Sequence, residues 1–124
     1  MNRIGKLNWA FAGGHIPFAS TGEEPMFNSH DKIAILNTAE EEAEIEIFIF
    51  YENSAPVGSY SLKVKAQRLR KVRFNDLIDP EAIQLERKFS CYLRSSLPVV
   101  VQFSRMDTGQ AANAVMGTIA FPAD

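Results

Sequence analysis

Hydrophobic and polar side chains alternate along most of the chain with a period of two residues, the pattern of β-strands that bury one face. The clearest case is the segment 43–51, where alternate positions are isoleucine. The opposite face of this segment changes from acidic to aromatic at Phe48 and Phe50, so we expect both faces to be covered at that end. The alternation predicts strands over residues 7–12, 33–37, 43–51, 59–65, 67–74, 89–94, 98–104 and 115–121.

Turn-forming residues fall between these segments and support their boundaries. About eight short strands separated by such signals are typical of a sandwich or a barrel. We therefore expect a single all-β domain over residues 1–124. The breakers are Gly13-Gly14, Glu24-Pro25, the run 55–58 and Asp79-Pro80.

Two short helices and one long loop complete the expected organisation. Asp79 as a cap with Pro80 at the first helical position predicts a short helix to about Arg87. Residues 107–114 could form a further turn or two of helix. The gap 13–32 is the longest, and a loop of this length in a small domain is usually functional or packed on a partner.

Composition narrows the functional classes without naming one. The chain has 124 residues, of which 46% are hydrophobic and 23% charged, with a formal net charge of −2. This balance gives no reason to expect a nucleic-acid binder, although a local patch remains open. No apolar run approaches the ~18 residues of a membrane span, so we do not expect a membrane-embedded protein. The apolar segment 7–12 is short for a signal peptide, which favours the cytoplasm.

Cysteine and histidine, which often act in catalysis or bind metal ions, are rare in this chain. A single cysteine, Cys91, excludes an internal disulfide, and its place between Phe89 and Leu93 indicates a small buried hydrophobe rather than a nucleophile. His15 and His30 are the only histidines, and they lack metal-site spacing. We therefore expect no enzyme, no metal site and no cofactor.

A basic run covers residues 63–73, with six positive charges and no negative one. On two adjacent strands it would offer a weak footprint for phosphate, hence for DNA. The alternatives are the solvent face of a hairpin, or ion pairs with Glu44 and Glu46, while the acidic run 40–42 is interpreted as a solvated turn. The candidate nucleic-acid residues are Lys63, Lys65, Arg68, Arg70, Lys71 and Arg73.

A polar cluster follows two of the expected strands, and its groups could hold a polar ligand. Asn75 and Asp76 end one strand, and Gln102, Arg105 and Asp107 end another, so they converge only if the two ends share a rim of the sandwich. The alternative is a turn at Asn75 with an Arg105–Asp107 ion pair that locks a corner or a subunit contact. The candidate ligand-binding residues are Trp9 as a flat apolar wall, His30, Asn75, Asp76, Gln102, Arg105 and Asp107.

Several short segments of the sequence resemble segments of the sensory rhodopsin transducer family. They run nearly end to end, and the Arg-Phe-Asn-Asp-Leu and Gln-x-x-Arg-x-Asp strings are not generic strand sequence. The matching segments are Trp9 with Ile16-Pro17, Ser29-His30, Ile35-Leu36-Asn37, Pro56-Val57-Gly58 with Tyr60, 72–77 with Asp79-Pro80, and 100–102 through Arg105, Asp107, Gln110 and Ala111.

The resemblance implies a small, jelly-roll-like antiparallel β-sandwich of short strands that assembles as a homotetramer. It also implies a signalling role at the cytoplasmic face of a microbial rhodopsin, a link to DNA, or the binding of a polar small molecule such as a sugar. We therefore expect a non-enzymatic binding and signalling module. The alternative is a sugar-like small-molecule binder with no rhodopsin partner.

The sequence departs from the family pattern in three places. Residues 13–15 stand where a glutamate, a glycine and an aromatic residue are expected, which puts a charged contact near Trp9 in doubt. Lys71 replaces an expected histidine, and Gly109 replaces a longer polar residue. None of these changes touches Asn75, Asp76, Gln102, Arg105 or Asp107.

Overall fold

The structure, a computed structural model, describes residues 4–15, 30–84, 87–107 and 114–124. For residues 15, 30, 105–107 and 114–119 it describes the main chain alone. The elements are β1 (Lys6–His15), β2 (His30–Asn37), β3 (Ala43–Tyr51), β4 (Val57–Val64), β5 (Arg68–Arg73), the 3-10 turn η1 (Phe74–Asp76), β6 (Lys88–Asp107), β7 (Ala114–Ile119) and β8 (Phe121–Ala123).

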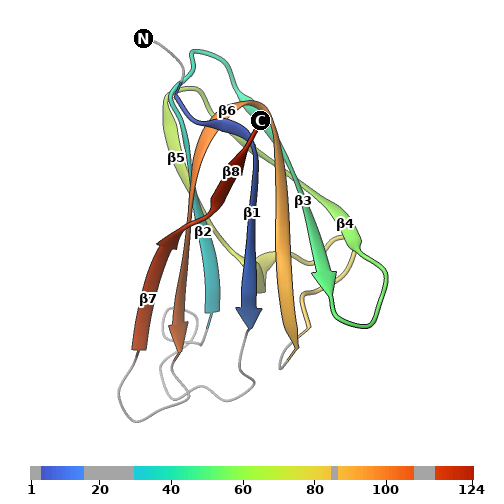
Figure 1. Cartoon of the computed structure of the whole chain (residues 1–124). Coiled ribbons are helices and arrows are strands. Elements are labelled where there is room, and N and C mark those ends of the chain that lie inside the picture. The colour runs from blue at the N-terminus through green and yellow to red at the C-terminus, as the bar shows by residue number, and fades with distance from the viewer. Residues whose placement is uncertain (1–3, 16–29, 85–86, 108–113) are drawn as a thin grey trace.

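The strands form two antiparallel layers that share β6 (Figure 1). Sheet A has the order β4-β3-β6-β1-β8, and sheet B has the order β5-β2-β6-β7. The expected all-β sandwich is confirmed. A jelly roll in its usual form divides its strands between two separate sheets, whereas here one strand belongs to both.

The expected strands at 89–94 and 98–104 are one continuous strand of 20 residues. Its first part pairs with β3 as far as Ser95, and its last part pairs with β2 from Val100 onward. Figure 1 shows β6 arching over one end of the sandwich between the two layers. Pro98 is tolerated because it lies at this crossing, where a strand needs no ladder hydrogen bond from its nitrogen. Proline therefore marked a change of sheet and not a strand end.

The last expected strand, 115–121, is divided in the structure. β7 pairs with β6 in sheet B, and β8 pairs with β1 in sheet A. Ala120 lies between them, 2% exposed, and its N–H donates to the Val101 carbonyl at 3.3 Å. The chain thus crosses between layers a second time at a small buried residue.

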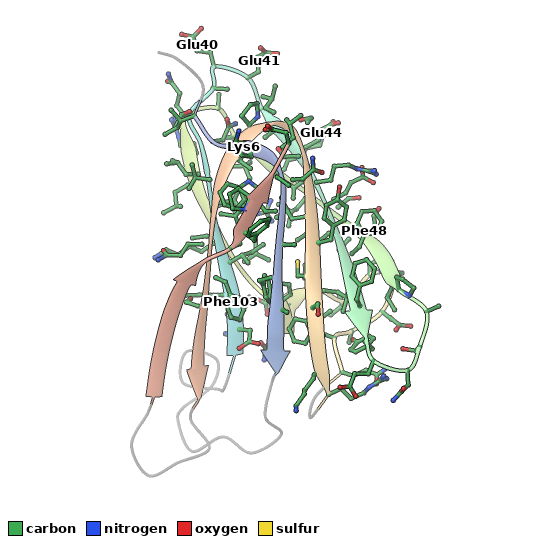
Figure 2. The ribbon with its side chains drawn as sticks, in the orientation of Figure 1. Lys6, Glu40, Glu41, Glu44, Phe48 and Phe103 are labelled. Carbon is green, nitrogen blue, oxygen red and sulfur yellow. The ribbon has the colours of Figure 1, made fainter. Side chains whose placement is uncertain are left out.

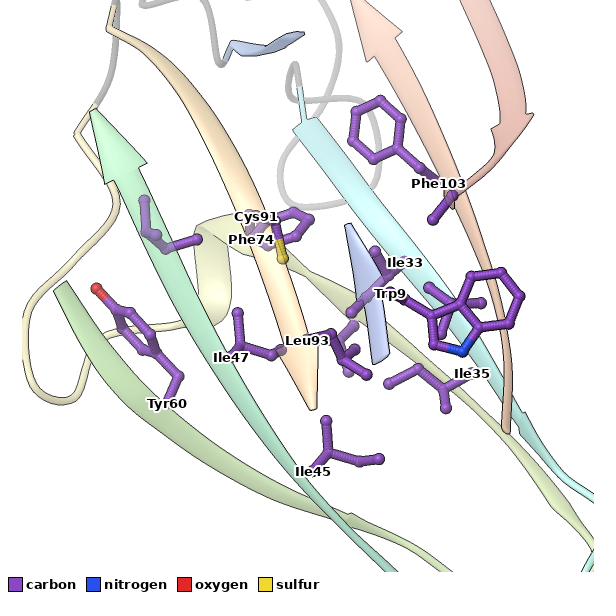
Figure 3. Close-up of a cluster of buried hydrophobic side chains, with 14 of the residues drawn as sticks. Trp9, Ile33, Ile35, Ile45, Ile47, Tyr60, Phe74, Cys91, Leu93 and Phe103 are labelled. Carbon is purple, nitrogen blue, oxygen red and sulfur yellow. The ribbon is translucent and has the colours of Figure 1, made fainter. Parts of the chain in front are cut away.

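The core lies between the layers and is built from the inward positions of the alternating strands (Figure 3). In β3 every second residue is buried, as the sequence pattern predicted for residues 43–51. Phe11 stacks on Phe103 with ring centroids 4.0 Å apart, so the aromatic side chains join β1 of sheet A to the sheet B part of β6. The largest fully buried side chains include Tyr60, Phe74, Ile33, Ile35, Ile45, Ile47 and Leu93.

The helix expected from Asp79 to Arg87 is wrong for the residues described, because 79–84 is not helical. Two tyrosines bind this segment instead. Tyr60 Oη donates to the Glu81 carbonyl at 2.6 Å, and the Gln84 N–H donates to Tyr51 Oη at 3.2 Å. Buried Ile83 anchors it to the core. Residues 16–29 of the expected loop and 108–113 of the second expected helix lie outside the described residues.

Candidate functional site

The expected polar cluster draws on strand ends that do share one rim of the sandwich. Arg73 at the end of β5 is the register partner of Lys32 in β2, and Lys32 is the partner of Ser104 in β6. η1, with Asn75 and Asp76, follows Arg73 directly. The side chains of His30, Arg105 and Asp107 lie outside the description, so a shared ligand site there stays a prediction.

The same rim contains a buried carboxylate that sequence reasoning missed. Asp31 is 1% exposed and is the register partner of Arg105. A buried carboxylate must be hydrogen-bonded or paired with a cation, which favours the structural interpretation of this corner. The sequence could not reveal it, because an aspartate near the start of a strand has no distinctive signal. Gln102 is exposed and pairs with Ala34, away from this rim.

Trp9 belongs to the core. It is 4% exposed, and its indole N–H donates to the main-chain carbonyls of Val99 at 3.0 Å and Lys6 at 3.1 Å. Both the ring and its polar atom are therefore used inside the protein. This placement corrects the idea of Trp9 as an open wall for a ligand.

The basic run does not form a hairpin with two paired strands. β4 pairs with β3 in sheet A, while β5 pairs with β2 in sheet B, so the turn between β4 and β5 joins different layers. The expected pairing with acidic residues is partial. Lys63 lies opposite Glu44 in register and forms an ion pair with Glu42 at 3.8 Å, whereas Glu46 pairs with Arg94 outside the run. The six basic residues therefore do not lie together on two paired strands, which is the arrangement expected for a phosphate site.

The outer face of sheet A carries a row of aromatic side chains that the sequence analysis did not assemble. In register, Phe48 lies opposite Tyr92, Tyr92 opposite Ala10, and Ala10 opposite Phe121. The Phe48 and Tyr92 rings stack with centroids 5.8 Å apart and planes at 21°. Phe121 is 74% exposed. We call this row, together with Phe50, the aromatic face.

The outward aromatic side chains of β3 are therefore only partly covered by other residues. Tyr92 stacks on Phe48, but Phe50 remains 41% exposed among the described residues. Figure 2 shows Phe48 and Glu44 along β3, where the acidic half of the strand gives way to the aromatic half. The expectation of a strand end covered on both sides holds for Phe48 alone.

Polar side chains hold the aromatic face in place. Arg94 donates from Nη2 and Nε to Glu46 Oε1 at 2.8 and 3.2 Å, and this hydrogen bond raises the pKa of the arginine. The same guanidinium lies 5.5 Å from the Phe48 ring centroid, within the range of a cation–π contact. On the other side, Tyr92 Oη donates to Asn8 Oδ1.

A groove of about 490 Å³ lies on the other side of the Arg94–Glu46 pair, and both residues of the pair line it while the Phe48 and Tyr92 rings do not. Two carboxylates and two cations line it, so its formal charge is balanced, and the Glu44 N–H donates to Ser96 Oγ at 2.8 Å inside it. The combination of hydroxyls and balanced charge suits a neutral polar ligand. The polar lining residues are Glu44, Glu46, Ser61, Lys63, Arg94, Ser95 and Ser96.

Cys91 is buried, as expected, and burial alone raises the pKa of its thiol. A thiol that stays protonated is a poor nucleophile. Within the described residues, no group of three or more histidine, cysteine, aspartate or glutamate side chains could hold a metal ion. In the same part of the chain, no helix is long and apolar enough to span a membrane.

Residues 4–122 match the family described as Anabaena sensory rhodopsin transducer. The chain belongs to this family. The solved structure of the Anabaena sensory rhodopsin transducer is 45% identical, with a TM-score of 0.76, and the alignment covers 83% of this chain and 99% of that one. The crystal structure of Thermotoga maritima 1070 is 31% identical, with a TM-score of 0.86 and coverage of 99% and 97%. Among curated protein sequences, none matches the chain.

Membership in the transducer family agrees with the resemblance drawn from the strings around Asn75 and Arg105. It also supports a signalling-type protein rather than an enzyme. The family match spans both the aromatic face and the polar rim, and it does not itself choose between them.

Proposed function

We propose that this chain is a non-enzymatic, cytoplasmic signalling protein of the transducer type, which binds a partner or a polar ligand through the aromatic face of sheet A. The observation that carries the proposal is the half-buried stack of Phe48 and Tyr92 beside the Arg94–Glu46 pair. Aromatic rings with a polar neighbour are the groups that dominate binding surfaces. The neighbour at 45% identity is named a sensory rhodopsin transducer, which supports a microbial rhodopsin as the partner.

Assembly as a homotetramer is the second part of the proposal. The described strands leave β4 and β8 as the edges of sheet A, and β5 and β7 as the edges of sheet B. Unpaired edges are commonly covered in soluble proteins, and a symmetric assembly covers several at once. Light scattering on the purified protein should give a mass near four subunits. A stable monomer at micromolar concentration would contradict this part.

The alternative is a binding domain for a sugar-like molecule with no rhodopsin partner. The groove beside the aromatic face favours it, because Glu44 and Glu46 balance Lys63 and Arg94. A neutral ring with several hydroxyls can use both signs of charge as donors and acceptors. From the groove it would reach past Arg94 to the Tyr92 ring, two residues earlier on the same face of β6. The link to DNA has weaker support here, since the basic residues divide between two sheets.

A thermal-shift screen against neutral sugars and other polar metabolites tests the ligand site, because a ligand that binds the native state raises its melting temperature. A hit should be lost in Tyr92→Ala and Arg94→Gln. It should persist in Gln102→Ala, which changes an exposed residue of sheet B. Equal loss in all three variants would place the ligand elsewhere.

The rhodopsin partner is tested with membranes that contain a microbial rhodopsin, compared with membranes of the same lipid without it. Sedimentation should carry the chain down only with the receptor, and Tyr92→Ala should prevent this. A rhodopsin gene next to the gene for this chain would favour the transducer role. Binding of sugars without any receptor binding would favour the alternative.

A further inference from the structure

The open side of the sandwich between β4 and β5 holds a second groove, which the proposed function does not use. In the described part of the chain β4 pairs only with β3, and β5 only with β2. Both edges border the groove, and the segment after η1 closes it. Its volume is about 310 Å³, at the small end of the range for sites that hold small molecules. We call it the seam groove.

Charges of both signs line the seam groove. Arg70 comes from β5, Asp76 from η1, and Asp79 from the segment that follows. Lys71 borders the groove too, although its register with Ala34 places its side chain on the outer face of sheet B. Among the ion pairs of the described residues, none joins one of these cations to one of these carboxylates. The groove therefore offers a positive and a negative wall whose charges do not cancel by direct contact.

The positive wall is held in position. Arg70 Nη1 donates to the Lys63 carbonyl at 2.7 Å, so the guanidinium reaches across the seam from β5 to β4. One nitrogen of the fork is occupied by this bond, which orients the plane of the group. The remaining N–H donors can still bind a carboxylate, whose geometry the planar fork matches.

The wall after η1 is also fixed. Tyr60 lines the groove and donates to the Glu81 carbonyl at 2.6 Å, which ties the segment to β4. Ile83 is buried in the core a few residues later. Ile78, in contrast, is 69% exposed and lies with Leu77 at the groove. An apolar group bound there would cover a side chain that otherwise faces water.

We propose that the seam groove binds a free α-amino acid with an aliphatic side chain, as the zwitterion. Its carboxylate would bind Arg70, its ammonium group would bind Asp76 or Asp79, and its side chain would cover Ile78. A phosphate or nucleic-acid strand would meet the two carboxylates, and a simple cation would meet Arg70. Only a ligand that carries both charges satisfies both walls.

Isothermal titration with L-leucine at low salt is the test, with two analogues that each lack one charge. The acid 4-methylpentanoate lacks the ammonium group, and isopentylamine lacks the carboxylate. We expect leucine to bind, and each analogue to bind at least about tenfold more weakly, since a charge-assisted hydrogen bond is lost. Inorganic phosphate is the probe for a simple anion site.

The variants separate the seam groove from the aromatic face. Arg70→Gln, and the double change Asp76→Asn with Asp79→Asn, alter exposed side chains and should each weaken leucine binding about tenfold. Arg94→Gln and Glu46→Gln, the matched changes on sheet A, should leave it unaltered. Circular dichroism checks the fold of each variant.

Three results would overturn the proposal. They are the absence of heat with millimolar leucine, equal binding of leucine and 4-methylpentanoate, and tighter binding of phosphate than of leucine. None of them bears on the aromatic face, whose ligand is tested with other variants.

Discussion

The two outer faces of the sandwich differ in chemistry although the same strand, β6, contributes to both. The aromatic face of sheet A combines stacked rings with carboxylates and cations. The outer face of sheet B combines aliphatic and basic side chains instead, with Leu69, Leu36 and Val100 in one row across three strands. Lys71, Ala34 and Gln102 form the next row, and none of the outward positions described there is a carboxylate.

This difference separates the residues that stabilise the fold from those available to contact a partner or ligand. The inward positions of both sheets are mostly aliphatic or aromatic, with isoleucine, valine and phenylalanine the commonest. The outward positions are not interchangeable, because rings suit stacking ligands and a basic aliphatic surface does not. We therefore expect substitutions of outward residues to change the proposed binding more than they change stability.

The largest effect should come from the core that both faces rest on. Leu93 in β6 is 1% exposed and lies opposite Trp9 and Ile47 in register. Leu93→Ala should lower the free energy of unfolding by about 3 kcal/mol, as expected for a leucine truncated in a core. Urea denaturation measures it.

The matched control for that change is Leu69→Ala on the outer face of sheet B, where the leucine is 56% exposed. It should change stability by less than about 0.5 kcal/mol. A loss at Leu69 as large as that at Leu93 would show that this face is covered in the assembled protein, and the contrast between the faces would fail.

Stability at alkaline pH should depend on Tyr60, which is buried on the inner side of sheet A. Burial raises the pKa of Tyr60 to about 12 from its ordinary 10.0, with Tyr51 and Glu81 adding to the shift. The folded state thus prefers the neutral phenol, so its stabilising effect is complete below pH 10 and is lost as the pH rises through 12.

Tyr60→Phe should flatten this loss and cost about 1–2 kcal/mol at neutral pH, because the Glu81 carbonyl loses its donor. Urea midpoints from pH 9 to 12 measure both effects. Tyr92→Phe, on the aromatic face, should keep the alkaline dependence. A steep loss that persists in Tyr60→Phe would assign it to another group.

A smaller effect is expected at the Arg94–Glu46 pair. Both side chains are about half exposed, and ion pairs in such positions contribute little to stability and are screened by salt. A double-mutant cycle with Arg94→Gln and Glu46→Gln should give a weak coupling that disappears at high salt. Strong coupling that survives high salt would mean that a neighbouring subunit buries the pair.

The smallest effect should be electrostatic and confined to sheet B. If the basic residues contact DNA, Lys71→Gln should leave the melting temperature unchanged and lower the salt slope of oligonucleotide binding by about 1, since Lys71 is exposed on sheet B. Lys63→Gln should not change the slope, because Lys63 lies opposite Glu44 on sheet A. Equal effects of the two changes would show that the contact spans both layers.

Much of the fold could be predicted because alternation is a local signal. The strand 43–51 was found with its observed bounds, since isoleucine at alternate positions fits one buried face. The joining of 89–94 to 98–104 could not be foreseen, because Pro98 forbids a ladder hydrogen bond only where a partner strand is present. The absence of a helix after Asp79 depends on Tyr51 and Tyr60, which bind that backbone from another element.

The candidate site was harder to predict, because it depends on register. Phe48 and Tyr92 are outward positions of two strands far apart in the sequence, and only their pairing brings the rings together. The sequence placed Asn75 and Arg105 at strand ends but left open whether those ends share a rim, which the pairing of β2 with β5 and β6 decides. The burial of Trp9 was missed because alternation places a residue on a face without saying whether a second layer covers it.

The continuity of β6 has a consequence for how the chain folds. Because one strand of 20 residues supplies ladder partners to β1 and β3 in one layer and to β2 and β7 in the other, neither layer is complete without it. Its partners come from both ends of the sequence, so assembly must wait for distant segments to meet, which slows folding. Amide hydrogens along the whole of β6 should then exchange together, as one cooperative unit that includes both layers.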